Sequence, residues 1–146
     1  MSNQPALIYT SGDNARLARM TLEAGWLVGM RSDKTAYVPI NFMDVDYRCP
    51  NFERHLAMVR EHRPQFAVVP DLSHTQIDQA DITRALHQAE RLQSVMPPGG
   101  VVLLVPKLLA QVSLIPQDFA LGYSIPSTNG KALYYPWSLQ KRRIHL

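Results

Sequence analysis

Cysteine is nearly absent from the sequence, with Cys49 as the only one. A lone cysteine forms no intramolecular disulfide and supplies no Cys-rich zinc site. The first five residues lack the basic start and apolar core of a secretory signal peptide. No apolar run approaches the ~20 residues that a membrane span needs. These absences predict a cytoplasmic protein with no membrane partner.

Motifs that hold cofactors or metals are also missing. Gly12 is the only glycine in the turn after the first apolar run, which is too few for a Walker or dinucleotide-binding loop. No histidine spacing matches a metal motif such as His-Glu-x-x-His. We therefore expect neither a cofactor nor a metal site.

What the sequence does contain is typical of one globular domain over residues 1–146. Hydrophobic residues make up 46% and charged residues 18%, which excludes a disordered chain. The formal charge of +3 permits a nucleic-acid partner but does not require one, because dedicated binders carry a denser basic face.

Apolar runs alternate with amphipathic segments along the chain. We expect strands at 6–10, 26–30, 37–43, 66–69, 101–105, 120–125 and 142–146, helices that begin near 14, 51 and 75, and short helical turns at 108–112 and 134–140. This alternation predicts an α/β fold with a mainly parallel sheet, either open or curled into a barrel. The runs from 6, 66 and 101 lack polar alternation, so we expect them at the centre of the sheet.

Three expected strands end in a proline followed by a polar residue: Val69-Pro70-Asp71, Val105-Pro106-Lys107 and Ile125-Pro126-Ser127. In parallel sheets and barrels, ligands bind at the carboxyl ends of the strands. The polar residues at these ends either form a ligand site or only cap helices and satisfy loop backbone groups. The candidate site residues are Ser11, Gly12, Asp44, Asp71, Lys107, Tyr123 and Ser127.

Asp71 and Lys107 are the candidate catalytic residues, and the other five are candidate binding residues. A carboxylate beside an ammonium group in a partly dry cleft can polarise a ligand, and the Ser11-Gly12 turn can add N–H donors. Lys107 can also act as a base or Schiff-base former, bind a phosphate, or simply neutralise Asp71. The sequence leaves these roles open.

Several stretches resemble a family of phage and prokaryotic proteins related to the tRNA-guanine transglycosylases. They are Gly25-Trp26-Leu27-Val28-Gly29, Asn51-Phe52-Glu53-Arg54-His55-Leu56, residues 63–73, Val105-Pro106-Lys107 and Gly122-Tyr123-Ser124-Ile125-Pro126. The resemblance implies a TIM-barrel-like fold and exchange of guanine for a deazaguanine base through an aspartate nucleophile, for which Asp71 is the best candidate and Asp44 the next. The chain departs from these enzymes in lacking their Cys/His zinc cluster. It also supplies only about half of the ~250 residues of a full barrel.

Two classes of function follow. The first is an enzyme of base-exchange (pentosyltransferase) type, or the amino-terminal part of one, that acts on a nucleobase, nucleotide or nucleic acid. The alternative is a non-catalytic binding or interaction module, in which the open edge of a partial barrel pairs with a second copy. Unpaired strand edges invite association, so we expect a homo-oligomer.

Overall fold

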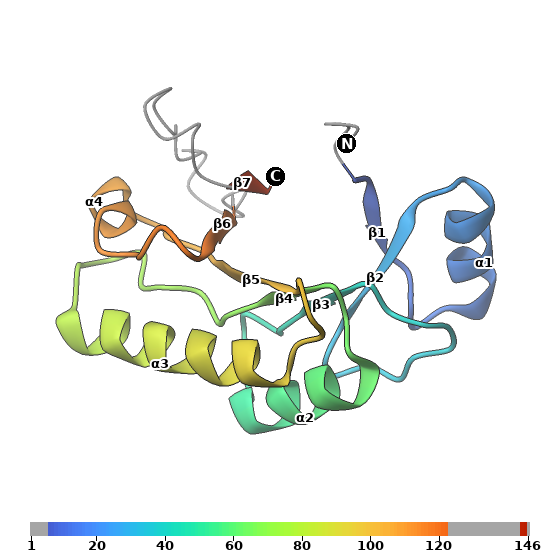
Figure 1. The fold of residues 1–146 in the computed structure, drawn as a ribbon, viewed down its shortest axis with the longest axis horizontal. Coiled ribbons are helices and arrows are strands. Elements are labelled where there is room, and N and C mark those ends of the chain that lie inside the picture. The colour runs from blue at the N-terminus through green and yellow to red at the C-terminus, as the bar shows by residue number, and fades with distance from the viewer. Residues whose placement is uncertain (1–5, 123–143, 146) are drawn as a thin grey trace.

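The computed structural model describes residues 6–122, 144 and 145, which form an α/β fold built on a parallel sheet (Figure 1). The strands lie side by side in chain order, and every neighbouring pair is parallel. They are β1 (Ile8–Thr10), β2 (Leu27–Arg31), β3 (Phe42–Asp44), β4 (Phe66–Val68), β5 (Val101–Leu104), β6 (Ala120–Gly122) and β7 (Ile144–His145).

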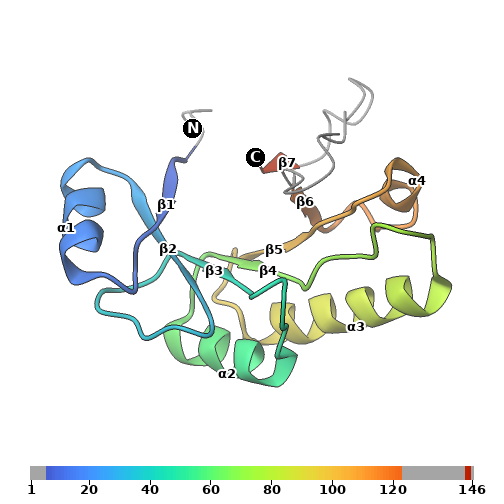
Figure 2. The same cartoon turned by 180° about the vertical axis from the view of Figure 1, so that it is seen from behind.

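The sheet is curved, and the three longer helices lie along its outer side (Figures 1 and 2). These helices are α1 (Ala15–Glu23), α2 (Phe52–His62) and α3 (Gln79–Val95), and a short α4 (Leu109–Val112) follows β5. A right-handed crossover between successive parallel neighbours returns the chain on the same face each time. Sequential strand order therefore explains why the helices share one side.

Local sequence sets the helix ends. The Asn14 side chain accepts a hydrogen bond from the Leu17 N–H (3.0 Å), and Asn51 accepts one from Arg54 (3.1 Å). Each caps a helix whose start the sequence predicts near this position, and of the two candidate caps Asp13 and Asn14 the structure uses Asn14. Gly25 adopts a left-handed φ of 75° just after α1, which costs glycine little.

Both faces of the central strands are buried, as their unbroken apolar runs predict. Ala67 and Val102 belong to the core between the sheet and the helices. Phe66, Val68 and Leu103 belong to a second apolar cluster on the opposite face. Successive side chains of a strand point to opposite faces, so every side chain of a strand that is covered on both faces is buried, and all of them are expected to be apolar.

Two sequence expectations were wrong. β1 was expected at the centre, but it is the first strand of the sheet and its Tyr9 and Thr10 are exposed. The strand expected at 37–43 shortens to Phe42–Asp44, because Pro39 has no N–H and the Tyr37 N–H donates to Gly12 instead of to a strand (3.0 Å). The turn expected at 134–140 lies outside the described residues.

None of the helices in the described part of the chain combines the length and the apolar character that a membrane crossing requires.

Candidate functional site

Asp71 and Lys107 meet at the carboxyl ends of β4 and β5. The ladder between these strands continues past their last residues, with Val69 N–H donating to Leu103 O (2.9 Å) and Leu72 N–H to Val105 O (3.3 Å). The two loops therefore leave the sheet together. Lys107 Nζ lies 2.6 Å from Asp71 Oδ2, and the two side chains are only 21% and 29% exposed.

Asp44 ends the adjacent strand, β3, and points to the same face as Phe42. Burial raises the pKa of its carboxyl group, and the negative charge of Asp71 raises it further. The Val45 N–H bond (2.8 Å) and the charges of Arg31 and Lys107 oppose this rise without cancelling it. Asp44 thus keeps its proton to a higher pH than an ordinary aspartate.

Asp46, two residues further on, belongs to a different set of contacts. Its carboxylate accepts a hydrogen bond from the Arg48 N–H (3.1 Å) and lies 3.5 Å from Arg31, which also pairs with Asp33. Within residues 6–122 and 144–145, no group of three or more His, Cys, Asp or Glu side chains is placed to hold a metal ion.

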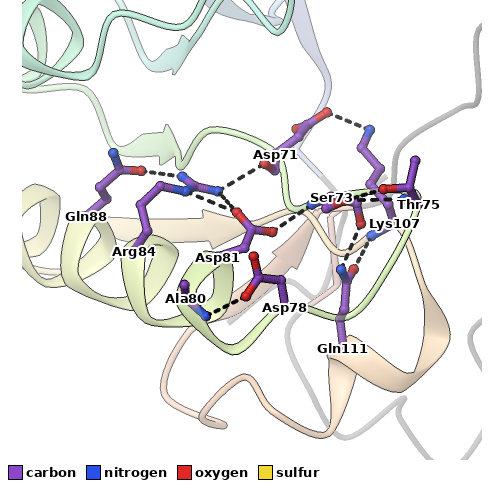
Figure 3. Close-up of polar contacts among 10 residues, drawn as sticks. All are labelled: Asp71, Ser73, Thr75, Asp78, Ala80, Asp81, Arg84, Gln88, Lys107 and Gln111. Carbon is purple, nitrogen blue, oxygen red and sulfur yellow. Dashed lines mark hydrogen bonds and ion pairs between the residues drawn. The ribbon is translucent and has the colours of Figure 1, made fainter.

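The first turns of α3 fix the loop that carries Asp71 (Figure 3). Arg84 donates to the backbone carbonyl of Asp71 (3.2 Å) and to the carboxylate of Asp81 (2.6 Å). Asp81 in turn accepts the Ser73 N–H (2.8 Å). The ion pair Arg84–Asp81 therefore holds the backbone on both sides of Leu72.

Gln111 joins the same loop to the one that carries Lys107 (Figure 3). This fully buried side chain accepts the N–H groups of Lys107 (2.8 Å) and Leu108 (2.9 Å). Its amide nitrogen donates to the Ser73 carbonyl (2.8 Å). Three bonds to backbone groups set the spacing between the two loops, so the Asp71–Lys107 pair is preorganised.

The other predicted site residues are placed differently. Ser11 is buried and shares a 2.8 Å hydrogen bond with Thr21, and its N–H donates to Tyr9 O (3.0 Å). The Gly12 N–H donates to Gly29 O (3.0 Å). Both N–H groups are therefore already engaged, and β1 lies three strands from β4, so we leave these two out of the proposed site. Tyr123 and Ser127 lie outside the described residues.

Sequence reasoning missed Asp81, Arg84 and Gln111. Asp81 was in principle visible, because it follows Asp78 by three residues at the start of the best amphipathic helix, where acidic residues favour a helix beginning. Arg84 was visible as its partner at i,i+3 spacing on the same helix. Gln111 gives no such signal, since its partners are backbone groups that only the folded loops bring near.

A family model matches residues 21–146, which include β2 and everything after it. The chain belongs to the DUF6610 family. DUF6610 is described as a family of unknown function. Searches of curated proteins and of solved structures found no match. The resemblance of this DUF6610 chain to the transglycosylases is not tested by these comparisons and stays a prediction.

Proposed function

We propose that this DUF6610 chain binds a nucleobase or nucleotide at the carboxyl edge of its sheet and carries out base exchange, as a pentosyltransferase of transglycosylase type. The meeting of Asp44, Asp71 and Lys107 at the ends of three adjacent strands is the observation that carries the proposal. Two carboxyl groups whose surroundings differ are the usual means of dividing acid and base duties.

The topology supports this proposal. Parallel strands in chain order with helices outside are arranged as in a (β/α)8 barrel, whose active sites lie at the carboxyl ends of the strands. We propose that the sheet is a partial barrel of this kind. The apolar cluster of Phe66, Val68 and Leu103 then corresponds to the packed barrel interior, with the charged residues at its rim.

In the proposed exchange, the Asp71 carboxylate attacks the anomeric carbon and the glycosidic C–N bond breaks. The departing base keeps the electron pair of that bond and takes a proton from Asp44, whose raised pKa favours the protonated form. The incoming base then attacks the same carbon, displaces Asp71 and gives its proton to Asp44. Lys107 stabilises negative charge on the ligand.

Calorimetric titration with guanine and a deazaguanine base tests this proposal. We expect the wild-type chain to bind and Asp71→Asn to bind at least ~10-fold more weakly. The Asp71 carboxylate can accept hydrogen bonds from the N–H groups of a free base in the same site, and hydrogen bonds to charged groups contribute ~1.5–3 kcal/mol. The melting temperature should change by only a few degrees, since Asp71 is partly exposed. Asp118→Asn is the matched control and should bind normally, because Asp118 is exposed and precedes β6, at the opposite end of the strands.

Equal binding by wild type and Asp71→Asn would remove Asp71 from the site. Binding of neither base by the wild type would favour the second candidate function, a non-catalytic module that forms homo-oligomers. A specific observation supports that candidate: within the described part of the chain β1 pairs with β2 alone, and Leu7 and Tyr9 at this edge are 53% and 48% exposed.

A further inference from the structure

A hollow of about 570 Å³ lies between the carboxyl ends of α2 and α3. These helices lead into β4 and β5, so the hollow sits at the amino ends of the strands, away from Asp71 and Lys107. Figure 1 shows the two helices side by side on the outer side of the sheet, and they contact one another. The lining includes Arg60, Arg63, Gln93, Ser94, Pro97 and Pro98.

Arg60 and Arg63 bring two positive charges to this hollow, and neither has a carboxylate partner among the residues that the structure describes. Arg31, Arg84 and Arg91, in contrast, each pair with an Asp or Glu. The guanidinium donors of the hollow are therefore free to bind an anion.

Arg63 also adopts an unfavourable backbone conformation, with φ 46° and ψ 54°. It is the only non-glycine residue with a positive φ in the described part of the chain. Glycine occupies such helix-ending positions at least cost, and the residue before a proline such as Pro64 prefers extended geometry. The backbone conformation therefore disfavours arginine at position 63. A need for its guanidinium group in the hollow would explain why arginine occupies this position.

We propose that this hollow is a second ligand site, which binds the phosphate group of a phosphate ester. Two guanidinium groups provide forked N–H donors that match phosphate oxygens, and the side chains of Pro97 and Pro98 offer an apolar wall to the organic part of the ligand. The ester is either a small molecule or a phosphodiester of a polynucleotide, since both present the same chemistry. This site is separate from the carboxyl edge, and its test does not depend on base exchange.

Titrations of the full chain with inorganic phosphate, a nucleoside monophosphate and a short single-stranded oligonucleotide test the proposal. We expect binding that weakens with added salt, and at least ~10-fold weaker binding by the Arg60→Gln/Arg63→Gln variant, because two charge-assisted contacts are lost. Tightest binding by the monophosphate indicates a small-molecule ligand, and tightest binding by the oligonucleotide indicates a polynucleotide. Either result supports the site.

The matched control is Arg16→Gln/Arg19→Gln, which removes the same charge from two exposed arginines of α1. It should change the dissociation constant by less than about twofold, since exposed distant charges are screened. Arg63→Gly separates binding from folding: we expect a melting temperature no lower than that of the wild type, because glycine tolerates a positive φ, together with weaker phosphate binding. Equal losses in the two double variants, or binding of none of the three probes at millimolar concentration, would overturn the proposal.

Discussion

His55 is a fully buried histidine of α2 whose ring reaches the end of β4. Its Nε2 lies 2.8 Å from the Val68 carbonyl, which can only accept, so Nε2 carries the proton of the neutral ring. Nδ1 is buried without a hydrogen-bond partner among the described residues. Burial lowers the pKa of His55 from 6.5 to about 4, although the bond to Val68 opposes this shift.

The lowered pKa predicts a loss of stability in mild acid. The unfolded chain binds a proton to this residue below pH 6.5, whereas the folded chain does so only below about pH 4. The contribution of neutral His55 is therefore complete above pH 6.5 and is lost as the pH falls toward 4, by roughly 3 kcal/mol. In His55→Gln, an amide takes over the bond to Val68 and does not titrate. Urea unfolding from pH 7 to 4 should show a flatter pH dependence in this variant.

His87→Gln is the control, because His87 is exposed on α3. The free energy of unfolding of this variant should change with pH as it does in the wild type. Asp44 changes the pH dependence of stability in the opposite direction. Its pKa is raised in the folded chain, so the folded chain holds this proton at a pH where the unfolded chain has lost it, and the free energy of unfolding falls as the pH rises. That contribution is common to all three proteins and cancels in the comparison. Equal slopes in wild type and His55→Gln would contradict the burial account.

At the scale of elements, the loops after β4 and β5 depend on Gln111. Gln111→Leu leaves the N–H groups of Lys107 and Leu108 and the Ser73 carbonyl without their side-chain partner. We expect a loss of about 3 kcal/mol in the free energy of unfolding, at ~1 kcal/mol for each bond. Urea denaturation measures this loss.

Gln88→Leu is the matched control, since the Gln88 side chain accepts one bond, from Arg84 (2.6 Å), and is not fully buried. It should cost less than ~1 kcal/mol. Equal losses in the free energy of unfolding of Gln111→Leu and Gln88→Leu would show that Gln111 only fills space and that its hydrogen bonds to the two loops contribute little.

The central elements could be predicted because their sequence signals are local. The runs at 66–69 and 101–105 are apolar on both faces and end in proline, and they became β4 and β5. Once these strands are parallel neighbours, the residues after their prolines must lie at one edge. The contact between Asp71 and Lys107 follows from that step.

Other features could not be read from the sequence because they depend on neighbours. The run at 6–10 looks as apolar as the one at 66–69, but strand order puts β1 at the end of the sheet. No local window distinguishes a central strand from a terminal one. The raised pKa of Asp44 likewise arises from burial and from Asp71, which lies 27 positions along the chain.

At the scale of the whole molecule, the two ends of the sheet are β1 and β7. Within the described residues these two strands do not pair with each other, and Figure 2 shows them apart at the open side of the curved sheet. A terminal strand presents backbone N–H and C=O groups that another strand can pair with. Beside them at β1 stand the half-exposed side chains of Leu7 and Tyr9. Both features favour association of the chain with a second copy through this edge.

We therefore expect a dimer in light scattering at micromolar concentration, and a shift toward monomer in the Leu7→Lys/Tyr9→Lys variant. Charged side chains oppose edge pairing, and the loss of two apolar contacts should weaken the dimer by more than ~10-fold. Ile77→Lys/Tyr37→Lys is the matched control, because these side chains are 49% and 64% exposed outside β1 and add the same charge. It should leave the dissociation constant of the dimer nearly unchanged. A wild-type chain that stays monomeric at every concentration, or equal effects of the two variants, would show that the β1 edge does not mediate association.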